Sequence, residues 1–196
     1  PVKRSAPQVL KQKIRNAARG STRVSIDHSK VYVRAIDGVS MAVNRGDRVG
    51  LIGKNGAGKS SLLHAIAGGM AIDSGEIKLD TRALQDWRDP ERARSLALQA
   101  QHSALNFPFT VEEVILLGRI PHRSGSASDR DIVDEVMQAT DTSSLRHRLF
   151  TQLSGGEKQR VQLARAVAQV WRQEDASCRL LLLDEPSSAL DLSHQR

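Results

Sequence analysis

The sequence predicts an α/β domain that has a mostly parallel sheet, an antiparallel β edge and an inserted α-helical subdomain. Short β-branched alternations fill residues 24–43, a pattern typical of paired antiparallel strands. Two continuous apolar runs at 48–52 and 180–183 have the character of strands buried on both faces of a parallel sheet. Between them, residues 111–170 carry apolar side chains at helical spacing. Helices inserted between strands of one parallel sheet account for all three observations.

Turns and changes of periodicity give the expected order of elements. Antiparallel strands are expected at 24–26, 31–33 and 39–43, a buried strand at 48–52, a helix from Lys59 to about Ala67, strands at 76–79 and 95–98, helices within 111–170 and a last strand at 180–183.

The charge of the chain is concentrated at its start. Among 196 residues, 29 are Lys or Arg and 22 are Asp or Glu, which gives a formal net charge of +7. Seven of the bases and no acid lie in the first 26 residues, so the rest of the chain is formally neutral. The excess therefore describes a basic N-terminal arm, residues 1–21, and argues against nucleic acid as a partner of the domain. The arm is either an amphipathic helix that docks on a membrane surface or partner, or a solvated tail.

A glycine-rich loop joins the expected strand at 48–52 to the first helix. Residues 53–60 satisfy G-x-x-x-x-G-K-[ST], in the strand–loop–helix context that this motif requires. Small residues let backbone N–H groups converge on phosphate oxygens, while Lys59 bridges the β- and γ-phosphates and Ser60 ligates Mg²⁺. The sequence thus predicts a P-loop NTPase core. The nucleotide contacts expected from this loop are Gly53, Lys54, Asn55, Gly56, Ala57, Gly58, Lys59, Ser60 and Ser61.

Two acids follow the last apolar strand. Because the carboxyl ends of parallel strands lie beside the ligand in open α/β sheets, Asp184 is expected to hold Mg²⁺. Glu185, the next residue, can polarise an attacking water and is the expected catalytic carboxylate.

A second glycine pair opens a later helix. Residues 153–160, here called the signature run, read Leu-Ser-Gly-Gly-Glu-Lys-Gln-Arg, and two glycines before a helix form an anion-binding nest. With the phosphate loop, the two acids and the run Ser-Ser-Ala-Leu-Asp at 187–191, this motif order resembles the nucleotide-binding domain of ABC transporters. The resemblance covers about residues 22–196, with the helical subdomain at about 103–172.

The resemblance implies ATP and Mg²⁺ as cofactors and a head-to-tail homodimer. In such a dimer the phosphate loop of one subunit faces the signature run of the other, and the contacts implied there are Ser154, Gly155, Gly156, Glu157 and Asp191. Gln101 fits the family's glutamine that contacts Mg²⁺ or the lytic water, and Gln99 is a competitor for this role. Tyr32 either stacks on the adenine base or belongs to the core.

The two halves of the chain resemble different transporters. From about residue 79 onward, runs such as Leu-Gly-Arg-Ile-Pro-His at 117–122 are similar to hemin-importer ATPases, whereas residues 1–78 are similar to polysaccharide-exporter ATPases. The leading expectation is the ATPase subunit of a hemin or iron-complex importer, peripheral to the cytoplasmic face of the cell membrane. Its partners would be transmembrane permease subunits and a periplasmic binding protein, without direct contact to the cargo. The alternatives are an ATPase for polysaccharide export and a soluble ABC-type ATPase that acts on ribosomes or nucleic acid.

Three further expectations concern loops and the end of the chain. His102 and His122 are expected to be ordinary surface residues rather than heme ligands. Phe107 and Phe109 either anchor a helix of the permease or pack between subdomains. The family's switch histidine lies beyond the point where this sequence ends, so the resemblance implies a chain that is incomplete at its C-terminus, with nucleotide binding retained and hydrolysis impaired.

Overall fold

The computed structural model of the chain describes residues 24–27, 30–33, 35–101, 105–122, 124–171 and 178–184. The basic arm at 1–21, His102, Glu185 and Asp191 lie outside the described residues, so the predictions made for them stay predictions. The chain divides into two units, of which the first ends at Leu62 and the second begins at Leu63.

The first unit opens with the expected antiparallel edge. Strand β1 (Val24–Asp27) pairs with β2 (Lys30–Val33), so that Val24 lies opposite Val33. The predictions of strands at 39–43 and 48–52 are wrong, because neither stretch is a strand. A strand is held by a ladder of backbone hydrogen bonds to a neighbour, and no described residue pairs with either stretch in this way. The side chain of Ile52 is 96% exposed, so the apolar run is not buried in this unit.

Helix α1 (Lys59–Ile66) begins where the sequence predicts, directly after the glycine-rich loop. Shortly after its last residue come Gly68 and Gly69, and Gly69 N donates to His64 O at 2.9 Å. Gly68 has a φ of +76°, a left-handed conformation that glycine adopts at little cost and that terminates helices.

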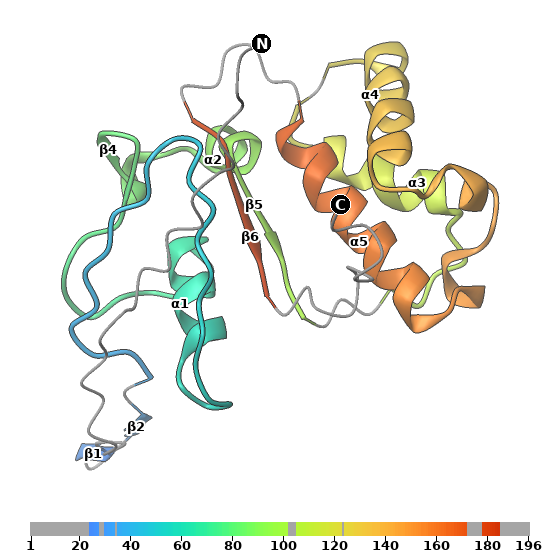
Figure 1. The fold of residues 1–196 in the computed structure, drawn as a ribbon. Coiled ribbons are helices and arrows are strands. Elements are labelled where there is room, and N and C mark those ends of the chain that lie inside the picture. The colour runs from blue at the N-terminus through green and yellow to red at the C-terminus, as the bar shows by residue number, and fades with distance from the viewer. Residues whose placement is uncertain are drawn as a thin grey trace, which may run out of the picture. The chain divides into compact units, whose positions relative to one another are not determined.

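A parallel strand pair organises the second unit. Strand β5 (Leu96–Gln99) pairs in parallel with β6 (Leu180–Leu183), and Leu96 lies opposite Leu180. The two strands run side by side in Figure 1, although more than 80 residues separate them in sequence, so the strands predicted at 95–98 and 180–183 are confirmed. The strand predicted at 76–79 is shorter than expected. It forms β3 (Lys78–Leu79), which makes an antiparallel hairpin with β4 (Arg82–Ala83) instead of joining the parallel pair.

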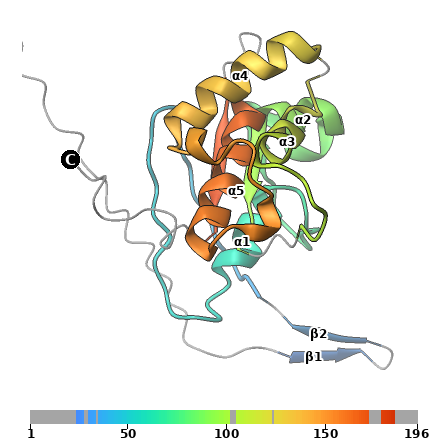
Figure 2. The same cartoon turned by 90° about the vertical axis from the view of Figure 1, so that its right-hand side faces the viewer.

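The helical part has its own apolar core. Helices α3 (Val111–Leu116), α4 (Ser126–Ala139) and α5 (Gly155–Val170) pack against one another (Figure 2). The two apolar stripes predicted from the sequence meet here. Their fully buried members, each 0% exposed, are Val111, Val114, Ile115, Val133, Val136 and Met137. Short 3₁₀ turns at Leu84–Asp86, Leu117–Arg119, Ser143–Leu145 and Phe150–Gln152, together with α2 (Asp89–Ser95), complete the described elements.

The C-terminal end of α5 is held by the 3₁₀ turn that follows α3. Arg119 is only 5% exposed and donates from Nη1 to Ala168 O at 2.8 Å and from Nε to Asp129 Oδ1 at 2.9 Å. His122 Nε2 donates to Gln169 O at 2.7 Å. The last carbonyl groups of a helix have no partner within it, so Arg119 and His122 act as side-chain caps for α5. The prediction that His122 is an ordinary surface residue is therefore wrong.

The burial of His122 also affects its ionisation. Partial burial is the largest cause that lowers the pKa of His122, and the positive charges of Arg119 and Arg94 lower it further. The hydrogen bond to Gln169 and the charge of Asp129 act in the opposite direction. The neutral imidazole is thus favoured as the cap of α5.

A close backbone contact fixes the same turn on α5. A Cβ atom on Gly118 would lie 2.3 Å from Arg165 O, so the turn can approach the helix only because residue 118 has no side chain. The same end of α5 also contacts α2 and β5, because Gln169 Nε2 donates to Ala93 O at 2.7 Å and to Leu96 O at 3.1 Å. The end of α5 therefore joins the helical part to the start of β5.

Candidate nucleotide site

The phosphate loop of the first unit is shaped by two glycines with positive φ. Gly56 and Gly58 have φ values of +78° and +86°, which residues with a side chain rarely adopt. A Cβ atom on Gly58 would also lie 2.5 Å from Ala35 O. Ala57 N donates to Lys54 O at 3.2 Å, and Leu62 N donates to Gly58 O at 2.9 Å. The loop is thus a tight turn that leads straight into α1, as the motif requires.

Lys59 folds back over this loop. Its Nζ donates to Gly53 O at 2.9 Å and to Lys54 O at 3.1 Å. An ammonium group carries three N–H donors, so these two carbonyl groups fix the side chain and leave donor capacity for an anion. Because the first N–H groups of a helix lack intrahelical partners, the start of α1 adds further donors at the same place. The arrangement suits a polyphosphate.

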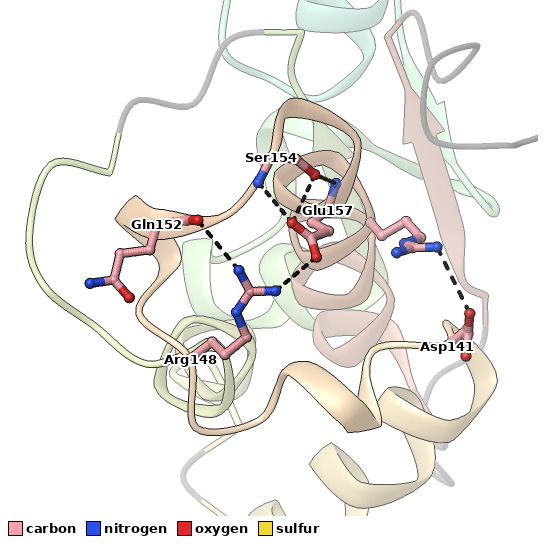
Figure 3. A network of polar contacts seen from close by, with 6 residues as sticks. Asp141, Arg148, Gln152, Ser154 and Glu157 are labelled. Atoms are coloured by element: carbon pink, nitrogen blue, oxygen red, sulfur yellow. Dashed lines mark hydrogen bonds and ion pairs between the residues drawn. The ribbon is translucent and has the colours of Figure 1, made fainter.

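The signature run forms the start of α5. Ser154 is the N-cap, and its Oγ accepts from Glu157 N at 3.4 Å. In return, Glu157 Oε2 accepts from Ser154 N at 2.8 Å and from the Ser154 hydroxyl at 2.7 Å (Figure 3). This reciprocal pair is a capping box, here called the α5 box. Ser154, Gly155 and Gly156 are exposed, and a Cβ atom on Gly155 would meet no heavy atom within 4 Å.

An arginine that the sequence analysis missed completes this box. Arg148 Nη1 donates to Glu157 Oε1 at 2.9 Å, and its Nη2 donates to Gln152 O at 3.5 Å (Figure 3). The hydrogen bonds from Ser154 to the carboxylate are the main cause that lowers the pKa of Glu157, and the positive charge of Arg148 lowers it further. Glu157 is therefore ionised at neutral pH.

The start of α3 carries a second capping box, which lies outside the predicted site. Glu113 Oε2 accepts from Thr110 N at 2.7 Å and from the Thr110 hydroxyl at 2.8 Å, and Thr110 Oγ1 accepts from Glu113 N at 3.3 Å. The spacing S/T-x-x-E in the sequence is typical of both boxes. This second pair is here called the α3 box.

The ends of the parallel strands carry the other predicted residues of the second unit. Asp184 follows β6 directly, is 6% exposed, and its backbone N donates to Gln99 O at 3.0 Å. Gln99 is the last residue of β5 and is 7% exposed, whereas Gln101 lies two residues beyond the strand and is exposed. Which of the two glutamines serves as the family's Mg²⁺- or water-contacting residue stays a prediction. Tyr32 lies in β2, and its role stays a prediction.

Neither a metal cluster nor a membrane-spanning helix is present among the described residues. Among them, no group of three or more His, Cys, Asp or Glu side chains is arranged to hold a metal ion. Within the same ranges, no helix is both long and apolar enough to cross a membrane.

The class of protein follows from comparison with known families. The profile of the family described as ABC transporter matches residues 36–188, a span that contains the phosphate loop, the signature run and Asp184. The chain belongs to this family. The fold agrees, because the ATP-binding cassette MJ0796, solved as a dimer bound to ADP and Pi, superposes with a TM-score of 0.69 at 26% identity over 88% of this chain and 74% of that one. The predicted fold class and family are therefore confirmed.

Curated relatives lie closer in sequence. The hemin import ATP-binding protein HmuV of Pseudomonas entomophila is 49% identical over 157 residues, which are 80% of this chain and 61% of that protein. The protein of the same name from Pseudomonas putida is 51% identical over 150 residues, or 76% of this chain and 58% of that one. The chain thus spans about three fifths of the length of the curated relatives it matches.

Proposed function

We propose that the chain is the ATP-binding and ATP-hydrolysing subunit of an ABC importer for hemin or a similar iron complex. The observation that carries the proposal is the phosphate loop, which turns through two left-handed glycines into α1 and is spanned by the Lys59 ammonium. Such a loop supplies converging N–H donors and one fixed positive charge to a triphosphate. The exposed glycine start of α5 is a second anion site of the same kind.

Within this proposal each predicted residue has a role toward ATP and Mg²⁺. Lys59 binds the β- and γ-phosphates, and the hydroxyl, amide and carboxylate oxygens of Ser60, Gln101 and Asp184 are the ligand types that Mg²⁺ prefers. Mg²⁺, when bound, would draw negative charge from the phosphate oxygens. Glu185 positions and polarises the attacking water. Asp184 suits its role, because burial at the end of β6 holds its carboxylate in place.

The assembly is proposed from the relatives. MJ0796 was solved as a dimer, so we expect two copies of this chain to place the signature run of one against the nucleotide of the other. Permease subunits would hold the dimer at the cytoplasmic face of the membrane, and a periplasmic binding protein would deliver the cargo.

The cargo is proposed from the names of the curated relatives, which are hemin import proteins. The 157 residues aligned with the Pseudomonas entomophila protein exceed the number from residue 79 to the end of the chain. The likeness therefore extends into the half that resembles exporters, and neither polysaccharide export nor a ribosome-directed ATPase is favoured.

Equilibrium binding of ATP to wild type and to Lys59→Ala tests the proposed function. Removal of a charged phosphate contact costs about 2–5 kcal/mol, so we expect the affinity to fall roughly 30-fold or more. Lys78→Ala is the matched control, because Lys78 is an exposed lysine whose partner is Glu76, and its affinity should equal that of wild type. Equal affinities of Lys59→Ala and wild type would contradict the proposal.

A further inference from the structure

We propose that Arg148 is a positioning residue for the phosphate contact of the signature run. The guanidinium of Arg148 compensates the negative charge of Glu157. This allows Ser154 and the exposed start of α5 to bind the phosphates of a nucleotide held by a second copy of the chain. This inference rests on the proposed function.

The first step concerns the donors of Ser154. Its backbone N–H and its hydroxyl both donate to one oxygen, Glu157 Oε2, at 2.8 and 2.7 Å. A hydroxyl carries a single proton, so a phosphate oxygen can receive it only in competition with Glu157. The carboxylate thus competes with any incoming anion for the two donors of Ser154.

The second step concerns charge. Glu157 directly follows the exposed Gly155 and Gly156, and its negative charge would repel an approaching triphosphate. Arg148 Nη1 lies 2.9 Å from Glu157 Oε1, the oxygen that Ser154 does not use. Since a guanidinium stays charged at all relevant pH values, the pair is neutral as a whole.

The third step is the comparison with the α3 box. The three hydrogen bonds of the α3 box match those of the α5 box in length to within 0.1 Å. Among the described residues, however, Thr110 is the only side-chain partner of Glu113. A capping box therefore forms without an arginine, and helix initiation alone does not explain Arg148. The difference between the two helix starts is the open glycine pair, which the α3 box lacks.

A structural role for Arg148 has to be separated from this electrostatic one. Its backbone carbonyl accepts from Val111 N at 3.0 Å, so the residue links the starts of α3 and α5. Substitution of the side chain leaves that backbone bond in place. The matched control is Arg146, two residues earlier, which pairs with Glu112 at 2.8 Å and with Asp134 and touches neither Ser154 nor Glu157.

The experiment measures ATP-driven dimerisation by sedimentation and, separately, the ATP affinity of the monomer, for wild type, Arg148→Ala, Arg146→Ala, Glu157→Gln and Arg148→Ala/Glu157→Gln. We expect Arg148→Ala to weaken the dimer about tenfold, the size of one hydrogen bond to a charged group, at unchanged monomer affinity. The double variant should dimerise more strongly than Arg148→Ala, because the uncompensated charge is then gone. Arg146→Ala should dimerise like wild type.

The outcomes separate the two proposals. A wild-type chain that binds no ATP overturns the proposed function and this inference together. If wild type binds ATP and dimerises, a double variant as weak as Arg148→Ala, or an Arg148→Ala variant as strong as wild type, overturns the inference alone. A readout without nucleotide is the pKa of Glu157 followed by NMR, which should rise in Arg148→Ala and stay unchanged in Arg146→Ala.

Discussion

The starts of α3 and α5 share one pattern of hydrogen bonds and differ in almost everything around it. Both begin with a hydroxyl residue whose backbone and side chain donate to a glutamate three residues later. After Thr110 comes Val111, which is completely buried, whereas after Ser154 comes Gly155, which is exposed and open on its Cβ side. Glu113 and Ser154 are both exposed, so both boxes lie at the protein surface, but in the described part of the chain only the α5 box has an arginine paired with its glutamate.

The comparison teaches that capping and ligand binding can use the same local chemistry. The N–H groups that a capping box satisfies are the groups that an anion would otherwise bind. What separates the two uses is the side chain that follows the cap and the charge that stands behind the glutamate. Three changes test this distinction.

The largest effect is expected at equivalent positions five residues after each cap. Ile115→Ala should lower the free energy of unfolding by about 2–5 kcal/mol, because it leaves a cavity in the core. Gln159→Ala should stay within about 0.5 kcal/mol of wild type, because the buried Oε1 of Gln159 has no hydrogen-bond partner among the described residues. Urea unfolding measures both variants. Equal decreases in the free energy of unfolding for the two variants would mean that both helix starts are packed equally well against the protein.

A smaller effect is expected at the caps themselves. Thr110→Ala and Ser154→Ala should each lower the free energy of unfolding by about 1 kcal/mol, the usual contribution of an N-cap hydroxyl. Only Ser154→Ala should also weaken ATP-driven dimerisation in sedimentation experiments. Weakening of the dimer by Thr110→Ala to the same degree would show that helix capping in general, rather than the Ser154 hydroxyl, matters to the nucleotide.

The smallest effect is a dependence on pH that both boxes share. Hydrogen bonds from the cap residue lower the pKa of Glu113 and of Glu157 below the ordinary value of 4.5. Because the folded-state pKa is depressed, the stabilisation is present above pH 4.5 and is lost as the pH falls through the folded-state pKa. Wild type should therefore exceed Glu113→Gln and Glu157→Gln in stability at pH 7, and the gap should narrow below pH 4.5 in thermal unfolding. A gap that is constant from pH 7 to pH 3 would contradict ionised boxes.

Local signals were sufficient to predict much of the fold and part of the site. The run of leucines at 180–183, the apolar stripe from Val111 to Ile115 and the helix start after Ser154 were all predicted, because each depends on neighbours within a few residues. The phosphate loop belongs to the same class, since its motif carries its own turn and helix start. The strand predicted at 48–52 was wrong because apolar character alone does not provide a pairing neighbour.

Contacts between distant segments could not be predicted. Arg148 meets Glu157 only because the 3₁₀ turn at Phe150–Gln152 brings the chain back to the start of α5. Arg119 and Ala168 are 49 residues apart, and no periodicity connects them. His122 was misjudged for the same reason, because its partner Gln169 is supplied by tertiary packing.

The hydrogen bonds at the end of α5 also have a consequence for synthesis on the ribosome. The two carbonyl groups that Gln169 binds belong to Ala93 and Leu96, residues made 76 and 73 positions earlier. At about 5–20 residues per second, these carbonyls leave the ribosome roughly 4–15 s before their donor does. During that interval the start of β5 depends on water or on a chaperone for its hydrogen bonds. These contacts between the start of β5 and the end of α5 therefore cannot form until residue 169 has been synthesised.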